Sequence, residues 1–179
     1  MKYIVGDICE PVSDGKIIIC HIVNDLGVMG AGVAKALYLK WYQVKTEYIR
    51  WAKNPPEKRA FKLGNIQPVT VDKDIVVINM IGQNGTISNP TSDAPPVRYE
   101  AIKACLAKVA KGVASLSNKY DVSVHIPYLM GCGLAGGDWK KVKAIINDCL
   151  CKKGIEVIIY VHETNLDKID KKLIQSFHN

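Results

Sequence analysis

The sequence lacks the signatures of several common function classes. No Gly-Lys-Ser/Thr triplet occurs in it, which excludes a Walker A nucleotide loop. None of the six cysteines stands in a CxxC pair, and no histidine lies at zinc-finger spacing from them, so we expect no metal site. No apolar run approaches the roughly 20 residues that span a bilayer, and the N-terminus does not resemble a secretory signal. We therefore expect a cytoplasmic protein without membrane contact, whose cysteines are reduced and mostly buried.

Positive charge is in excess: the sequence has 24 Lys and Arg and 17 Asp and Glu, which gives a net charge of +7. This balance favours anionic ligands. The lysines are spread along the chain, and the densest groups, "DWKKVK" and "NLDKIDKKL", include acids at helical spacing. That pattern predicts solvated helix faces and does not favour nucleic acid as a partner. With 179 residues, the chain is long enough to fold without disulfides or metals, and we expect one domain over 1–179.

Apolar patterning predicts an alternating α/β chain. Strands are predicted over 1–8, 16–23, 65–71, 75–81, 121–127 and 155–161, and helices over 32–41, 43–53, 97–116, 138–151 and 164–177. Several strands are apolar throughout, which indicates a mixed sheet covered by helices on both faces. Ligands of such sheets bind at the carboxyl ends of the strands. The longest loop, 82–96, is of a length that is often functional.

Two glycine-rich loops follow apolar strands and open predicted helices, "HIVNDLGVMGAGVAK" at 21–35 and "GCGLAGGDW" at 131–139. Glycine lets backbone N–H groups approach an anion, and a helix N-terminus adds partial positive charge. The first loop departs from a dinucleotide-binding fingerprint, because Lys35 replaces its third glycine. A tight connection without a ligand is the alternative for this loop alone. Two such loops on adjacent strands suit a diphosphate, and Asp138 is placed to cap the second helix.

Three motifs together resemble a known family: "VGDI" at 5–8, "HIVNDLGVMGAGVA" at 21–34 and "IPYLMGCGLAGGDW" at 126–139. Their order and spacing resemble a macrodomain over nearly the whole chain. The resemblance is closest to the branch of the ADP-ribose 1″-phosphate phosphatases and terminal ADP-ribose protein glycohydrolases. It implies a three-layer α/β/α fold with a mixed, mostly parallel central sheet, ADP-ribose or a derivative as the ligand, and no cofactor.

The resemblance also implies a role for each matching residue. Asp7 would accept a hydrogen bond from the adenine amino group, beside the Ile8 backbone, and Asn24 would face the distal ribose. Tyr160 or His162 would border the adenine, although a plain core tyrosine is the alternative for Tyr160. The two loops would hold the distal ribose and diphosphate through Met29, Gly30, Ala31, Gly32 and Val33 on one side and Gly131, Cys132, Gly133, Leu134, Ala135, Gly136 and Gly137 on the other.

The sequence departs from the glycohydrolases of this branch, which use a lysine after the middle strand and an aspartate in the second loop. Here "INMIGQNG" at 78–85 has no lysine, and Ala135 stands at the aspartate position. No amine is therefore available to attack the ribose carbon. The phosphatase members carry a histidine three residues before the asparagine, as His21 and Asn24 do here.

We therefore expect hydrolysis of ADP-ribose 1″-phosphate to ADP-ribose and phosphate. Asn24 would orient the ribose, and His21 or Asp138 would assist an attacking water. A structural role is the alternative for His21. Hydrolysis of ADP-ribosyl esters on proteins is a second possible reaction. A non-catalytic reader of ADP-ribose or ADP-ribosylated proteins also stays open, and the missing lysine and aspartate favour it.

Overall fold

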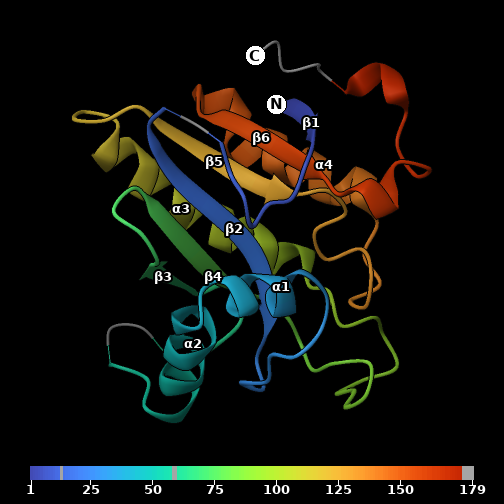
Figure 1. The fold of residues 1–179 in the computed structure, drawn as a ribbon. Helices are drawn as coiled ribbons and strands as arrows, with labels where there is room; N and C mark the ends of the chain where they lie inside the picture. The colour runs from blue at the N-terminus through green and yellow to red at the C-terminus, as the bar shows by residue number, and fades with distance from the viewer. Residues whose placement is uncertain (13, 58–59, 175–179) are drawn as a thin grey trace.

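The central element of the fold is one six-stranded sheet. The computed structural model describes residues 1–12, 14–57 and 60–174 (Figure 1). The strands are β1 (Lys2–Val5), β2 (Lys16–Asn24), β3 (Ile66–Thr70), β4 (Ile75–Gln83), β5 (Val122–Pro127) and β6 (Glu156–Val161). Their order is β1-β6-β5-β2-β4-β3, and every neighbouring pair is parallel except the antiparallel pair of β3 and β4. The predicted mixed, mostly parallel sheet is confirmed.

Helices cover both faces of the sheet, so the predicted three-layer α/β/α fold is confirmed as well. Four α-helices are described: α1 (Gly32–Lys40), α2 (Gln43–Lys53), α3 (Tyr99–Leu116) and α4 (Trp139–Cys149). In Figure 1, α1 and α2 lie in front of the sheet, and α3 and α4 lie behind it. Three short 3-10 turns follow: η1 (Cys151–Lys153), η2 (Glu163–Asn165) and η3 (Lys171–Leu173).

Two hydrophobic cores form because successive strand residues point to opposite faces. Ile19 of β2 packs in the core that α1 and α2 cover, together with Leu37 and Tyr48. Its neighbour Cys20 packs in the other core, under α3 and α4, with Leu106. Both faces of the strand are therefore buried, which explains its continuous apolar run. The sequence therefore changes from apolar to polar residues only at the ends of such a strand, where the loops begin.

The predicted elements differ from the structure mainly at their ends. The first strand stops at Val5, because the chain bends at Gly6 and then turns between Asp7 and Glu10. The helix predicted over 164–177 is wrong within the described residues, which hold only the turns η2 and η3 there. The side chains of His162 and Asp170 accept backbone N–H groups two residues on and so close short turns. Residues 175–177 of that prediction lie outside the described residues.

All six cysteines are free thiols, and Cys9, Cys20, Cys105 and Cys149 are buried. No helix among the described residues is long and apolar enough to cross a membrane. Within the same residues, no group of three His, Cys, Asp or Glu side chains could hold a metal ion.

Candidate functional site

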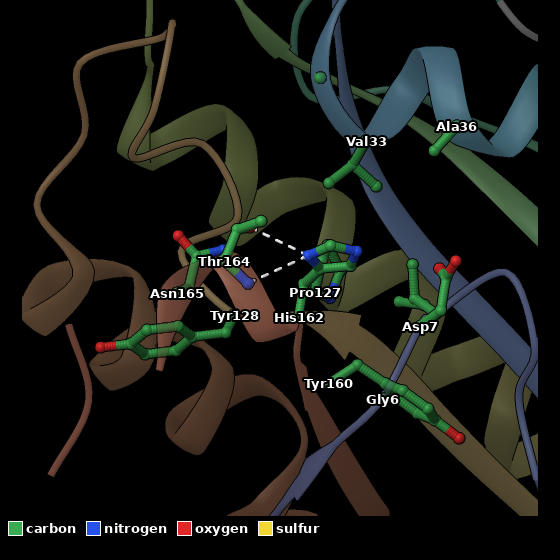
Figure 2. A pocket seen from close by; sticks show the side chains of 12 residues that line it. Gly6, Asp7, Val33, Ala36, Pro127, Tyr128, Tyr160, His162, Thr164 and Asn165 are labelled. Carbon is green, nitrogen blue, oxygen red and sulfur yellow. Dashed lines mark hydrogen bonds between the residues drawn. The ribbon is translucent and has the colours of Figure 1, made fainter. Parts of the chain in front are cut away.

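A cavity of about 240 Å³ lies at one edge of the sheet (Figure 2). Because β1, β6, β5 and β2 are parallel neighbours, their carboxyl ends share this edge. The cavity is lined by Gly6, Asp7 and Ile8 after β1, by Gly32, Val33 and Ala36 of α1, by Pro127 and Tyr128 at the end of β5, and by Tyr160, His162, Thr164 and Asn165 of β6 and η2. The first and last strands of the chain thus build one site together.

Six of the predicted ligand-binding residues line this cavity: Asp7, Ile8, Gly32, Val33, Tyr160 and His162. The cavity lining does not include Asn24, Met29–Ala31 or the loop 131–136, which belong to the connections that leave β2 and β5 at the same edge. The structure therefore brings the residues expected at the adenine together with Gly32 and Val33, two of those expected at the distal ribose and diphosphate. The other residues expected there stay predictions.

Asp7 is an exposed carboxylate fixed by its own turn. Its Oδ1 accepts the backbone N–H of Cys9 at 2.8 Å, and its backbone carbonyl accepts the N–H of Glu10 at 3.0 Å. The Cys9 thiol also hydrogen-bonds to this carboxylate, and burial together with the Asp7 charge raises the pKa of the thiol to about 12. The turn thus holds the carboxylate in place at the surface, where its remaining lone pairs can accept a donor from a ligand.

His162 presents a defined face to the cavity. Its Nδ1 accepts the backbone N–H of Thr164 at 3.3 Å and lies 2.9 Å from the Thr164 hydroxyl. A backbone N–H can only donate, so Nδ1 is the acceptor and the proton of the neutral ring is on Nε2. Figure 2 shows the ring in the middle of the cavity, with Val33 above it and Asp7 to one side. An acceptor on Asp7 and an N–H donor on His162 therefore line the same cavity.

Tyr160 lines the cavity with part of a largely buried side chain. The side chain is only 3% exposed, and its hydroxyl accepts the backbone N–H of Val12 at 3.0 Å. The ring stacks on His125 with centroids 5.2 Å apart. Burial raises the pKa of the Tyr160 phenol above its ordinary value. Tyr160 is thus a core residue with one edge at the cavity.

The N-terminus of α1 borders the cavity with unused hydrogen-bond donors. Its N-cap residue, Ala31, makes no side-chain cap, and the first turn of the helix contains no acidic residue. Gly32 has a φ of +56°, a conformation that glycine adopts without strain. The first backbone N–H groups of a helix have no partner within the helix, so they are available to an anion.

The second glycine loop is held closed by its own backbone. Gly137 donates its N–H to the carbonyl of Gly131 at 2.9 Å, and Gly131 and Gly136 have φ values of +73° and +69°. Asp138 caps α4 by accepting the backbone N–H of Lys140 at 2.8 Å, as predicted. The carboxylate expected to assist a water is thus already engaged by its helix.

Asp25 joins the first loop to the long loop that follows β4. Its two carboxylate oxygens accept the Asn84 side-chain amide at 2.6 Å and the Gly85 N–H at 2.8 Å. Further along, the N–H of Val97 donates to the carbonyl of Ala135 at 3.0 Å. Three loops are therefore bound to one another beside the cavity, and together they form a connected wall.

His21 lies inside the protein and is not part of the cavity lining. It is 1% exposed, and its Nε2 lies 2.6 Å from Oδ1 of Asn79 on β4. Burial lowers the pKa of this imidazole to about 4. An acid or base must reach the reacting atoms, so this position favours the structural interpretation of His21 over the catalytic one.

Sequence reasoning did not find Gly6, Ala36, Pro127, Tyr128, Thr164 and Asn165, which also line the cavity. Tyr128 is part of the third sequence motif and directly follows an apolar strand, which is the signal that could have marked it. Thr164 and Asn165 belong to the region predicted as a helix, and none of the three motifs includes them.

Comparisons with known proteins identify the family. No family model matches the chain. An uncharacterized protein of Invertebrate iridescent virus 6, 032R, is 43% identical over 63 residues, which are 33% of this chain and only 62% of the viral protein. A protein of unknown function from Bacteroides thetaiotaomicron has a solved structure that is 39% identical, with a TM-score of 0.81 over 89% of this chain and 96% of that chain.

Two further solved structures are named macrodomains. One, from Streptomyces coelicolor, is 38% identical, with a TM-score of 0.74 over 89% of this chain and 97% of that chain. The other is a mutant from Oceanobacillus iheyensis with ADPR, 16% identical, with a TM-score of 0.64 over 89% of this chain and 83% of that chain. Because the 38% identity extends over nearly all of the Streptomyces protein, the present chain belongs to the macrodomain family.

Proposed function

We propose that this macrodomain binds ADP-ribose in the cleft at the carboxyl edge of its sheet. The observation that carries the proposal is the pairing, within one 240 Å³ cavity, of the Asp7 and His162 hydrogen-bonding groups with an uncapped helix N-terminus. A neutral adenine base is bound by hydrogen-bond acceptors and donors, whereas the backbone N–H groups at a helix N-terminus bind a diphosphate. The solved Oceanobacillus macrodomain with ADPR supports the same ligand.

The adenine is the part of ADP-ribose that we place in this cavity. Asp7 Oδ2 accepts the adenine amino group, and the His162 Nε2–H donates to a ring nitrogen. Small-molecule pockets usually measure roughly 300–1,000 Å³, so a cavity of about 240 Å³ holds only part of this ligand. The diphosphate then follows the N-terminus of α1, and the distal ribose reaches the loops 24–33 and 131–137.

The second candidate function is hydrolysis of an ADP-ribose derivative, with ADP-ribose 1″-phosphate as the favoured substrate. Connected loops beside the distal ribose favour it, because they can hold a phosphate and a water in fixed positions. Water is the nucleophile in this reaction, so the missing lysine does not matter. Hydrolysis of ADP-ribosyl esters on proteins uses the same geometry. A reader of ADP-ribosylated proteins needs the cleft alone.

Calorimetry with ADP-ribose tests the binding proposal. Gly30→Val is the informative variant, because Gly30 has an ordinary φ and no atom within 4 Å of the position of an added Cβ. The first carbon of the new side chain therefore has room in the loop that should hold the diphosphate, and we expect the valine to abolish binding. Gly112→Val is the matched control, since Gly112 has equally open surroundings on α3, behind the sheet. Equal binding by both variants would contradict the proposed ligand site.

Phosphorus NMR of ADP-ribose 1″-phosphate with the protein separates the two candidate functions. Growth of inorganic phosphate at a catalytic rate establishes a phosphatase. Shifted diphosphate resonances without new phosphate indicate binding only, and the next assay is then release of ADP-ribose from ester-modified protein.

A further inference from the structure

Among the described residues, Tyr48 on α2 is the one buried side chain outside the loop of Asn24 that hydrogen-bonds to Asn24. It is 0% exposed, and its hydroxyl lies 2.6 Å from the backbone carbonyl oxygen of Asn24 and 3.0 Å from its side-chain Oδ1. Burial raises the pKa of this phenol far above its ordinary value. The hydroxyl therefore stays protonated and shares its single proton between the two oxygens.

The Asn24 amide has little hydrogen-bonding capacity left. Its Oδ1 accepts the backbone N–H groups of Leu26 at 3.0 Å and Val28 at 3.3 Å, in addition to the Tyr48 hydroxyl. Its Nδ2 donates one proton to the Val28 carbonyl at 2.7 Å. An amide oxygen has two lone pairs and an amide nitrogen two protons. One N–H is therefore the only group that Asn24 can still offer to a ligand.

We propose that Tyr48 is a positioning residue that fixes Asn24 as a single N–H donor to an oxygen atom of the distal ribose. This inference rests on the proposed function. Two backbone N–H groups donate to Oδ1, and the phenol shares its proton between Oδ1 and the Asn24 carbonyl, so a rotation that presents the amide oxygen to a ligand would break these hydrogen bonds. The ligand must then bring an acceptor, either a ribose hydroxyl oxygen or the oxygen that carries the leaving group. Tyr48 should therefore not affect the affinity of the protein for a ligand that lacks the distal ribose.

The position of α2 does not depend on Tyr48 alone. Gln67 of β3 donates its Nε2–H to the carbonyl of Glu47 at 2.8 Å, and Asn79 donates to the carbonyl of Val44 at 3.2 Å. Gln67 also accepts from Asn79 at 3.0 Å. This set of buried hydrogen bonds, to which His21 belongs, anchors the helix without touching Asn24. Gln67→Met, which removes the two hydrogen bonds of Gln67, therefore supplies a control for weaker anchoring of the helix.

The test compares Tyr48→Phe with Gln67→Met, using ADP-ribose and ADP as two ligands in calorimetry. ADP lacks the distal ribose. We expect Tyr48→Phe to bind ADP-ribose about tenfold more weakly, the effect of one net hydrogen bond, and ADP unchanged. We expect Gln67→Met to keep the wild-type ratio of the two affinities. Equal losses for both ligands in Tyr48→Phe would mean a purely structural role and would overturn the proposal.

NMR of the Asn24 side-chain amide tests the positioning without any ligand. We expect nitrogen-15 relaxation to report a rigid NH₂ group in the wild type and in Gln67→Met, and a mobile one in Tyr48→Phe. An equally rigid amide in Tyr48→Phe would also overturn the proposal. If the wild type binds neither nucleotide, the proposed function fails, while this measurement still decides the role of Tyr48.

Discussion

Replacing Asp7 by Asn separates the hydrogen bond that its Oδ1 accepts from Cys9 from the one that we propose its Oδ2 accepts from the adenine. Asn keeps an oxygen at the position of Oδ1, so the Cys9 N–H retains its acceptor and the turn after β1 persists. The second oxygen becomes an NH₂ group, which faces the adenine amino group donor to donor. A hydrogen bond to a charged group contributes roughly 1.5–3 kcal/mol. We therefore expect ADP-ribose affinity to fall by about 10- to 150-fold.

The decisive comparison is between ADP-ribose and a ligand with a different base. The inosine analogue of ADP-ribose carries a carbonyl oxygen in place of the amino group. The wild type should bind it weakly, because two acceptors then face each other, whereas Asp7→Asn should bind it better than the wild type does. Calorimetry with both ligands measures the reversal, and thermal unfolding checks that the fold is intact. Equal loss of affinity for both ligands would show that Asp7 does not contact the base, and our placement of the adenine would be wrong.

Two further predictions concern stability. Burial lowers the pKa of His21 and of His125 to about 4, so each ring takes up a proton when the chain unfolds in mild acid. The free energy of unfolding should therefore fall by about 2 kcal/mol per histidine between pH 8 and pH 5. Urea unfolding at the two pH values measures this loss, and a His21→Gln variant with an unchanged pH dependence would contradict it. Gly136→Ala should lower the free energy of unfolding by about 1–2 kcal/mol, because its φ is +69° and the added Cβ would lie 3.0 Å from a proline ring carbon. Gly133→Ala, with ordinary φ and open surroundings, should stay within about 0.5 kcal/mol of the wild type in the same assay.

The fold could be predicted because its signals are local and repeated. Apolar runs such as 16–23 mark strands buried on both faces, and their alternation with helical periodicity is typical of a mostly parallel sheet. The cap of α4 by Asp138 depends on a contact two residues along the chain. The C-terminal turns were predicted wrongly, because side chains such as Asp170 close them locally in competition with helix formation.

The candidate site was only partly predictable, for a physical reason. Asp7 and Gly32 stand in motifs that a sequence shows directly. The role of Tyr48 depends on where a helix from another part of the chain packs, and the sequence holds no signal for that contact. The same holds for His21. A histidine at the end of an apolar strand can face a ligand or a buried amide, and only packing decides which.

The order in which the strands are made has a consequence for synthesis on the ribosome. Within the sheet, β1, the first strand, has β6, the last, as its one neighbouring strand. Asp7 therefore emerges early, but its counterpart His162 emerges only after almost all of the chain. Nascent chains that end before β6 carry an unpaired β1 and an unfinished nucleotide cleft, whatever the state of β2, β4 and α2. Ligand binding by ribosome-bound chains of increasing length would then begin abruptly, once β6 and η2 have left the exit tunnel.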